Sequence, residues 1–458
     1  MSTRLNNVII LAAGKSSRMN TDLPKILQPL GGKPIIQYLI DLVISLNIIN
    51  IYVVYGHKGN LVKNYFVNQP VVKLIEQPEL LGTGHAVQQV LPYLNIDDDV
   101  LIICGDSPLI TKETLKKLIN RKESKGISIL TALVFNYSEY GKIIRKNNNI
   151  VQIIENTDDI YTYTNSTEIN VGVYVISVID LQRWLKLLKN NNLKNEYYIT
   201  DIVFLAHQEK YKINAVCSEN INEFMGINNC VQLSEVERLY QKKEAKKLML
   251  AGVRIVDYNR FDLRGTLNHG INVTIDVNVI IEGDVFLGDN VYIHSGCVLK
   301  NCIIGNNSVI NNNSIICDAV IASDCIIGPF AHLRQGTNLN NNVCIGNFVE
   351  IKNTNLQPHS KAKHLSYLGD ADIGSNVNIG AGTITCNYNG VNKCKTIIGN
   401  HVFIGANTEI VAPINISDHA TIGAGTTLTH DVKKNELVIR RSKQKHILNW
   451  KRNIKKNN

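Results

Sequence analysis

Three features are missing from this sequence, and each absence narrows the class of protein. No apolar run approaches the roughly 20 residues that span a bilayer, so we expect no membrane partner. The first seven residues lack the basic segment, apolar stretch and cleavage site of a signal peptide. The ten cysteines include no C-x-x-C pair, which favours free thiols over zinc ligands or disulfides. We therefore expect a cytoplasmic protein.

The charge of the chain is concentrated at one end. The formal net charge is +9 over 458 residues, with 44% apolar and 19% charged residues, as in a folded protein of two or three domains. Residues 433–458 hold ten Lys or Arg and one acid, Glu436, which accounts for the whole net charge. We interpret this segment as a solvated basic tail, and expect small polyphosphate ligands rather than nucleic acid.

A six-residue repeat fills the second half. Ile275, Ile281, Leu287, Ile293 and Leu299 fall six apart, and the period continues with slips to Leu428. Six fits neither a helix nor a long strand, but three strand-plus-turn units make one triangular coil. We predict a left-handed parallel β-helix over residues 253–432.

Asn, Asp and Gly are expected to form the corners of the coils. Gly374, Gly399, Gly405 and Gly423 would tolerate the tight backbone there. Asn runs such as 311–313 and 340–342 are interpreted as compositional bias. The repeat is interrupted at 352–372 and 380–397, and these interruptions are where chemistry is expected.

Residues 1–228 alternate apolar runs with helix-like stretches, which predicts an α/β, Rossmann-like domain around a largely parallel sheet. A buried strand at 8–11 precedes a small-residue loop, Ala12 to Gly14, that lets backbone N–H groups approach a nucleotide. Lys15, Arg18 and Lys25 would supply charge to its phosphates. The loop is neither a Walker loop nor G-x-G-x-x-G. Residues 229–252 read as an amphipathic helix linking the domains, with a coiled coil as the alternative.

Two later segments add polar groups to the same end of the predicted sheet. Gln77 and Thr83 lie around Gly82 and are candidates to read a base edge. Asp106 follows the strand at 100–103, where open α/β sheets bind ligands, and is therefore a candidate Mg²⁺ ligand. A surface aspartate that caps a turn is the alternative.

Four motifs, taken in order, carry a family resemblance. They are Leu-Ala-Ala-Gly-x-x-x-Arg-Met, Leu-Pro-Lys, Leu-Gly-Thr-Gly-His-Ala and Gly-Asp-x-Pro-Leu. They resemble the sugar-1-phosphate nucleotidyltransferases. With the β-helix behind them, residues 8 to 441 resemble the bacterial bifunctional enzymes that make UDP-N-acetylglucosamine. Those enzymes acetylate glucosamine 1-phosphate with acetyl-CoA, then transfer UMP from UTP to the product. The resemblance implies Mg²⁺, a homotrimer and these small-molecule substrates.

The resemblance also implies roles for residues of the first site. Arg18 and Lys25 would face the phosphates as catalytic groups, and Asp106 and Asn228 would hold Mg²⁺. The nucleotide sugar would be bound by Leu11, Ala12, Ala13, Gly14, Lys25, Gln77, Gly82, Thr83, Cys104, Gly105, Asp106, Gly141, Glu155, Asn170 and Asn228. Transfer of this kind needs alignment and charge neutralisation, so the lack of a general base is expected.

For the second site, the resemblance implies that His364 is the general base, although a loop histidine is more often a surface residue. The amino-sugar phosphate would be bound by Arg334, Lys352, Tyr367 and Asn378. Acetyl-CoA would meet Ala381, Asn387, Tyr388, Ala406, Ala424 and Arg441, with Asn387 and Tyr388 also beside the sugar.

Four positions depart from the family pattern. Ala406 replaces a serine, His332 and Gln335 flank Arg334 where Arg and Pro are usual, and Lys142 replaces an arginine. A lost neutral hydrogen bond would cost about 1 kcal/mol of binding. Two other hypotheses remain: a nucleotidyltransferase whose β-helix is only a scaffold, and a non-catalytic nucleotide sensor. The joint presence of Arg18, Lys25 and Asp106 disfavours the sensor.

Overall fold

The computed structural model describes residues 5–14, 17–56, 58–134, 140–155 and 167–452. The chain divides into two compact units, Met1–Tyr240 and Gln241–Asn458. Helix α7 (Cys230–Leu250) lies within the range predicted for a linker helix and contributes to both units. No helix among the described residues is long and apolar enough to cross a membrane.

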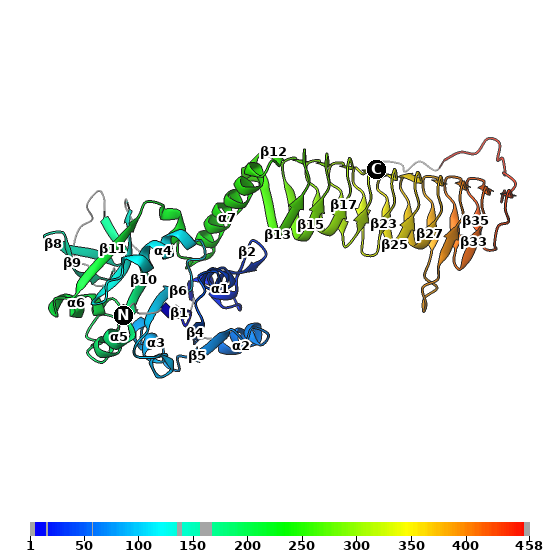
Figure 1. Cartoon of the computed structure of the whole chain (residues 1–458). Coiled ribbons are helices and arrows are strands. Elements are labelled where there is room, and N and C mark those ends of the chain that lie inside the picture. The colour runs from blue at the N-terminus through cyan, green and yellow to red at the C-terminus, as the bar shows by residue number, and fades with distance from the viewer. Residues whose placement is uncertain (1–4, 15–16, 57, 135–139, 156–166, 453–458) are drawn as a thin grey trace. The chain divides into compact units, whose positions relative to one another are not determined.

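The first unit is built on a sheet in the order β11-β7-β10-β6-β1-β4-β5 (Figure 1). Strand β10 runs antiparallel to both of its neighbours, and the other neighbouring pairs on this path are parallel. The strands are β1 (Leu5–Leu11), β4 (Asn50–Tyr55), β5 (Val72–Glu76), β6 (Asp99–Cys104), β7 (Gly126–Val134), β10 (Thr167–Ser177) and β11 (Lys212–Ser218). Strands β8 (Lys142–Lys146) and β9 (Asn149–Ile154) form a hairpin beside β10.

Helices cover both faces of this sheet because successive strand residues point to opposite sides. Val8 and Ile10 pack with one group of helices, whereas Ile9 packs with the other, and all three are fully buried. The first group is α1 (Ile35–Ser45), α2 (Gly59–Phe66) and α4 (Lys112–Arg121). The second is α3 (Thr83–Gln88), α5 (Val178–Leu185) and α6 (Asp201–Gln208). This arrangement confirms the predicted Rossmann-like α/β domain.

The strand order reverses at β1, which places a binding position there. From β1 the chain builds outward through β4 to β5, then returns to β6 on the other side of β1. Leu11, the last residue of β1, pairs with Cys104, the last residue of β6. In open α/β sheets, ligands bind outside the carboxyl ends of the strands at such a reversal. The loops after β1 and β6 are therefore adjacent by topology.

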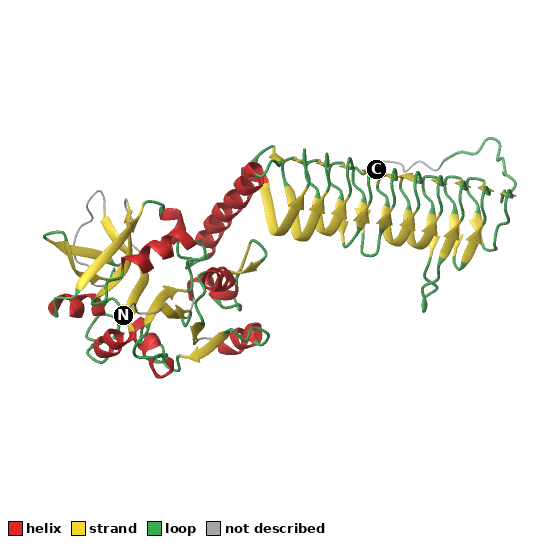
Figure 2. Ribbon diagram, in the orientation of Figure 1, coloured by secondary structure: helices red, strands yellow, loops and turns green. Residues whose placement is uncertain are grey.

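The second unit is a parallel β-helix, as the six-residue repeat predicted (Figure 2). Residues 17 or 18 apart pair in parallel in most coils, such as Ile275 with Ile293 and Ile293 with Ile310. The repeat residues Ile275, Ile281, Leu287 and Ile293 are fully buried in one continuous core. One sheet runs β12 (Arg254–Ile255), β14 (Thr274–Ile275), β16 (Tyr292–Ile293), β18 (Val309–Ile310), β21 (Ile326–Ile327), β24 (Cys344–Asn347), β26 (Lys361–His364), β28 (Asn378–Ile379), β31 (Phe403–Ile404), β34 (Thr421–Ile422) and β36 (Leu437–Val438).

The remaining sides of each coil form a second, 14-stranded sheet. Its strands are β13 (Phe261–His269), β15 (Val279–Leu287), β17 (Val298–Ile304), β19 (Ile315–Cys317), β20 (Val320–Ile321), β22 (His332–Leu333), β23 (Asn338–Leu339), β25 (Glu350–Leu356), β27 (Tyr367–Ile373), β29 (Ile384–Cys386), β30 (Thr396–Ile398), β32 (Glu409–Val411), β33 (Ile414–Ile416) and β35 (Thr427–Leu428).

Asparagine and aspartate occupy many of the corners, as predicted. Most left-handed corner positions are asparagines, and neighbouring coils link them into hydrogen-bonded ladders. Asn290 Nδ2 donates to Asn307 Oδ1 at 2.9 Å, and Asn307 Nδ2 to Asp324 Oδ1 at 3.0 Å. Asparagine suits both roles, since it tolerates positive φ and carries a donor and an acceptor. Asn313 and Asn342 are also left-handed, so interpreting these Asn runs as compositional bias was wrong.

Most of the four predicted corner glycines have another purpose. None of Gly374, Gly399, Gly405 and Gly423 has a positive φ. A Cβ on Gly374 would instead lie 2.5 Å from the carbonyl carbon and oxygen of Gly399 in the next coil. Gly399 and Gly405 likewise face backbone atoms of the next coil, so these three glycines permit close stacking of coils, whereas Gly423 faces only the ends of side chains.

The first predicted interruption is also absent. Strands β25, β26 and β27 run through residues 352–372 with regular 17-residue pairing, such as Ile345 with Ala362. Leu356, Ala362 and Leu368 are in register with the earlier repeat residues and fully buried. The period is hidden in the sequence because it shortens to five residues between Ile351 and Leu356 and because small Ala362 takes the next inward position. The second interruption is real: pairing jumps to 25 residues at Asn378 with Phe403, and residues 387–395 form an added loop.

Candidate active sites

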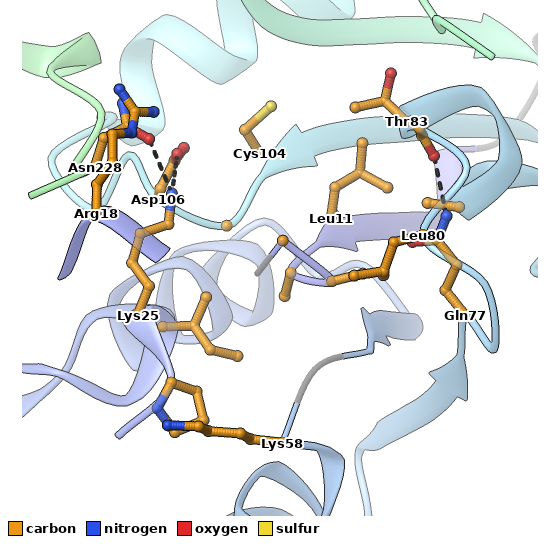
Figure 3. Close-up of a pocket in the computed structure, with 18 of the residues that line it drawn as sticks. Leu11, Arg18, Lys25, Lys58, Gln77, Leu80, Thr83, Cys104, Asp106 and Asn228 are labelled. Atoms are coloured by element: carbon orange, nitrogen blue, oxygen red, sulfur yellow. Dashed lines mark hydrogen bonds and ion pairs between the residues drawn. The ribbon is translucent and has the colours of Figure 1, made fainter. Parts of the chain in front are cut away.

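A cavity of about 990 Å³ opens at the carboxyl ends of β1 and β6 (Figure 3). Its lining includes Arg18 and Lys25, which were predicted to face the phosphates, and the predicted metal ligands Asp106 and Asn228. The lining residues are Leu11, Ala12, Ala13, Gly14, Arg18, Asn20, Thr21, Asp22, Leu23, Pro24, Lys25, Ile26, Lys58, Gln77, Leu80, Gly82, Thr83, Ala86, Cys104, Gly105, Asp106, Lys194, Glu196 and Asn228. Lys15 lies outside the described residues.

Backbone contacts join the loops after β1 and β6. Gly105 N donates to Leu11 O at 2.8 Å, and Ala12 N donates to Val54 O at 2.9 Å. A Cβ on Gly105 would lie 2.9 Å from Leu11 O, so a side chain there would push the loops apart. Gly14, by contrast, faces open space where a Cβ would point. The first loop is thus fixed at its base and open toward the cavity.

Lys25, Asp106 and Asn228 converge on one point (Figure 3). Lys25 Nζ lies 2.7 Å from Asp106 Oδ2 and 3.3 Å from Asn228 Oδ1, and both ion-pair side chains are mostly buried. Ile227 N donates to Asp106 O at 3.1 Å, which brings the Asn228 segment to the strand end. The oxygens of Asp106 and Asn228 thus both contact one positive charge, the ammonium of Lys25.

This donor set fits Mg²⁺. Mg²⁺ favours one or two protein oxygens and completes its shell with water and phosphate oxygens. Among the described residues no group of three or more His, Cys, Asp or Glu could hold a metal alone. Asp106 Oδ2 and Asn228 Oδ1 would therefore supply the protein ligands, and the substrate the others.

Gln77 and Thr83 shape the opposite wall of the cavity. Gln77 Nε2 donates to Gly82 O at 3.0 Å, while Thr83 Oγ1 accepts from Ile199 N at 3.0 Å. Gln77 is 4% exposed. Both side chains thus hold the loop itself, and only Gln77 Oε1 has no hydrogen-bond partner among the residues that the structure describes. Thr83 accepts from Ile199 N and keeps its O–H as a donor, so its hydroxyl can still contact a base.

Three predicted sugar-binding residues gather outside the lining of the cavity. Asn170 N donates to Gly141 O at 2.8 Å, and Glu155 Oε1 accepts from Thr200 Oγ1 at 2.9 Å. Cys104 links this cluster to the cavity: burial raises the pKa of its thiol to about 12, and the charges of Asp106 and Glu155 act in the same direction. Residues 135–139 and 156–166, which flank the cluster, lie outside the described part.

Sequence reasoning missed several lining residues. Lys58 and Leu80 follow β4 and β5, and the rule that placed Asp106 at a strand end applies to them as well. Lys194 and Glu196 had no such signal. Their segment reaches the cavity because Tyr197 N donates to Leu81 O at 2.8 Å, a contact across more than a hundred residues.

On the β-helix, the predicted acetyl-site residues form two groups. The first contains Arg334, Lys352, Tyr367 and Asn387 near the left-handed corner residue Asp370. Asn387 Nδ2 donates to Asp370 Oδ2, and the neighbouring ammonium of Lys393, followed by Arg334, lowers the pKa of Lys352. Three cations therefore lie close together on the surface. Tyr388 belongs to the adjacent added loop.

The second group lies beside another corner, at Leu365. His364 Nδ1 is 3.0 Å from Asn347 Oδ1 in the preceding coil. Ala381, Ala406 and Ala424 continue the same column in the following coils. Arg441 Nη1 donates to Ala424 O at its end, and Asn378 stands three residues before Ala381. The departures His332 and Gln335 lie with Arg334 in the first group, and Lys142 opens β8 in the first unit.

Three protein-family models match separate parts of the chain. The MobA-like NTP transferase domain matches residues 8–139, the GMPPB C-terminal domain residues 265–368, and the hexapeptide repeat of succinyl-transferase residues 395–430. The first match contains most of the cavity lining, and the others lie on the β-helix. Sheet, cavity and matches together define the class: the chain is a nucleotidyltransferase whose α/β domain is followed by a hexapeptide-repeat β-helix.

Solved structures resemble about half of the chain. A candidate glucose-1-phosphate thymidylyltransferase of Bacillus anthracis, in complex with sucrose, is 20% identical with a TM-score of 0.43, covering 51% of this chain and 94% of its own. HddC of Yersinia pseudotuberculosis is 19% identical with a TM-score of 0.41. It covers 52% of this chain and 100% of its own. The complex of HddC with GMP-PN is also 19% identical to this chain, with a TM-score of 0.40. It covers 52% of this chain and 100% of its own.

Proposed function

We propose that the α/β domain transfers UMP from UTP to N-acetylglucosamine 1-phosphate. A phosphate oxygen of the sugar phosphate attacks the α-phosphorus of UTP, the bond to the bridging oxygen breaks, and pyrophosphate leaves. The attacking group is already an anion, so no general base is needed. The observation that supports this most is the convergence of Lys25, Asp106 and Asn228 in the cavity.

Each charged group then has a place in the transfer. Arg18 and Lys25 orient the phosphates and balance the charge that develops on the leaving pyrophosphate. Asp106 and Asn228 would hold Mg²⁺, which would supply further neutralisation of phosphate charge. Because Lys25 already contacts both oxygens, we expect its ammonium to shift toward the phosphates when the nucleotide binds.

Pyrophosphate release tests this proposal directly. Purified chain, Mg²⁺ and UTP should release pyrophosphate only when N-acetylglucosamine 1-phosphate is present, and chelation should stop the release. A panel of the four nucleoside triphosphates and of glucose 1-phosphate tests the substrate choice. Preference for another triphosphate would overturn the uridine assignment, while release with none would overturn the transfer itself.

We propose a second reaction on the β-helix: acetyl transfer from acetyl-CoA to glucosamine 1-phosphate. His364 takes a proton as the amine nitrogen attacks the thioester carbon, and the C–S bond breaks to release CoA thiol. The hydrogen bond to Asn347 Oδ1 uses Nδ1–H, which leaves Nε2 as the base. The supporting observation is a column of equivalent positions in successive coils. His364 is followed there by Ala381, Ala406 and Ala424, and Arg441 hydrogen-bonds to Ala424 at the far end.

We further propose that this second site forms between copies of the chain in a homotrimer. Its two groups lie at different corners, so a neighbouring copy would bring one group to the other. Phe330, Phe348 and Leu365 form an exposed apolar column beside His364, and all three adopt positive φ. Bulky residues in that strained region are rare, and exposed apolar patches mark interfaces.

A scaffold-only β-helix is the competing hypothesis. The uninterrupted coil at 352–372 removes one reason for placing chemistry there. The clustered cations around Lys352 and the added loop at 387–395 favour acetyl transfer instead. Absence of thiol release from acetyl-CoA with glucosamine 1-phosphate would favour the scaffold.

A further inference from the structure

Lys58 combines a strained backbone with a side chain that enters the nucleotide cavity. Its φ of 56° and ψ of 37° are left-handed, a region that glycine adopts freely and lysine rarely does. It stands at the N-terminus of α2, directly after the strand β4. Non-glycine residues held in this region concentrate at functional sites.

The Lys58 ammonium binds the backbone of a distant loop. Nζ donates to Thr21 O at 3.0 Å and to Asp22 O at 2.9 Å. Asp22 Oδ1 is 3.5 Å away, but that side chain is fully exposed, so the ion pair contributes little. The two charge-assisted bonds to carbonyl oxygens therefore carry the contact.

That loop leads directly to Lys25. Gln28, a few residues further along the chain, also fixes the loop. Its Nε2 donates hydrogen bonds to Thr21 Oγ1 at 2.8 Å and to Leu23 O at 3.1 Å. Lys58 holds it from a different element. Pro24 then fixes the entry to the short helix Lys25–Leu27, from which Lys25 reaches Asp106. The ammonium of Lys58 is thus linked through three residues of backbone to the position of Lys25.

We propose that Lys58 is a positioning residue of nucleotidyl transfer. Its side chain clasps the 20–24 loop and holds Lys25 in line with Asp106 and Asn228 before the nucleotide enters. This inference rests on the proposed transfer for its kinetic consequence, but the clasp itself is a property of the chain without substrate. A cation that only bound phosphate would leave the loop unchanged when removed.

Two variants and one control test the clasp. Lys58→Gly removes the ammonium and relieves the left-handed strain, so the fold should be retained. Lys58→Arg keeps a donor that reaches the same carbonyls. Lys210→Gly is the control. Lys210 follows α6, has a similar left-handed backbone (φ 62°) and does not line the cavity, so this variant relieves the same kind of strain away from the site. Hydrogen exchange of the backbone amides of residues 21–28 is measured without substrate, followed by kcat and KM for UTP.

Exchange in residues 21–28 should rise about tenfold in Lys58→Gly, from the loss of two charge-assisted hydrogen bonds, and kcat should fall about tenfold. Lys58→Arg should restore most of both, and Lys210→Gly should resemble the natural chain. Unchanged exchange with a raised KM would overturn the clasp and make Lys58 a phosphate ligand. Faster exchange with unchanged kcat would overturn its role in positioning. If the natural chain does not use UTP, the proposed function fails, but the exchange result still decides on the clasp.

Discussion

At the scale of single residues, the ion pair of Asp106 with Lys25 marks the centre of the proposed first site. Asp106 is the only acid that contacts Lys25 among the described residues, and it was placed correctly from its position after a buried strand. The sequence left open whether it binds a cation or caps a turn. Its ion pair with Lys25 and its closeness to Asn228 favour cation binding.

Asp106→Asn should therefore lower kcat/KM for pyrophosphate release by about 10² to 10³, because one anionic ligand of Mg²⁺ is lost while the side-chain shape is kept. Steady-state kinetics over a Mg²⁺ titration measures this. Asp41→Asn, which changes an exposed acid paired with Lys33, is the control. Equal activity of Asp106→Asn and the control would remove Asp106 from the metal site.

Cys104 gives a prediction about reactivity. Burial raises the pKa of its thiol to about 12, so the thiol stays neutral at pH 8 although it lines the cavity. Iodoacetamide at pH 8 should label the exposed Cys217 and Cys230 and leave Cys104 unmodified, as read by mass spectrometry of peptides. Labelling of Cys104 that UTP prevents would show a reactive thiolate instead.

At the scale of elements, the repeat predicted the β-helix and part of its corner chemistry. Apolar spacing reports what points inward, and so it located the buried aliphatics. It carries no information on backbone angles or on contacts between coils, which is why the corner glycines were given the wrong role while asparagine was placed correctly. It also failed where the period slips by one residue between Ile351 and Leu356 and Ala362 takes an inward position.

Gly374→Ala should destabilise the β-helix by about 1–3 kcal/mol, since the added methyl would overlap backbone atoms of Gly399 that cannot move aside. Gly423→Ala is the matched control. There the nearest atoms are ends of the Ile439 and Arg441 side chains, at 3.3 and 3.4 Å. Chemical denaturation compares the two. Equal destabilisation would argue against the close-stacking role.

Buried thiols make the β-helix sensitive to alkaline pH. Burial raises the pKa of Cys302 to about 12 and of Cys297 and Cys325 to about 11, from an ordinary 9.0. Their stabilising effect is complete below pH 9 and is lost as pH rises toward 11, because only the unfolded thiols ionise.

The free energy of unfolding should fall between pH 8.5 and 10.5 by about 2 kcal/mol for each buried thiol. Cys302 pairs in register with Val285, so valine fits its position. Urea denaturation at both pH values measures the free energy of unfolding. In Cys302→Val, the decrease between the two pH values should be smaller by the contribution of one thiol. An identical loss in Cys302→Val would mean that other groups titrate.

At the scale of the whole molecule, the sequence could not place the second site. Its residues were identified by resemblance, and within one chain they separate into the groups at Asp370 and Leu365. Sequence order does not encode contacts between copies. The first site could be predicted more completely because strand order alone brings its loops together. Segments such as 194–196 join it through tertiary contacts that no local pattern reveals.

Phe348→Glu should convert the proposed trimer to monomers, since a charge would enter the apolar column of Phe330, Phe348 and Leu365. Light scattering after gel filtration gives the mass. Acetyl transfer should fall with the trimer, while uridylyl transfer persists. Monomers that retain full acetyl transfer would place the second site within one chain.

The most direct test of two separate sites measures both reactions on the same samples of natural chain, His364→Ala and Asp106→Asn. The two readouts are thiol release from acetyl-CoA with glucosamine 1-phosphate and pyrophosphate release from UTP with N-acetylglucosamine 1-phosphate. We predict both activities in the natural chain, loss of thiol release alone in His364→Ala, and loss of pyrophosphate release alone in Asp106→Asn. Loss of both activities in either folded variant, or no thiol release from the natural chain, would contradict the account.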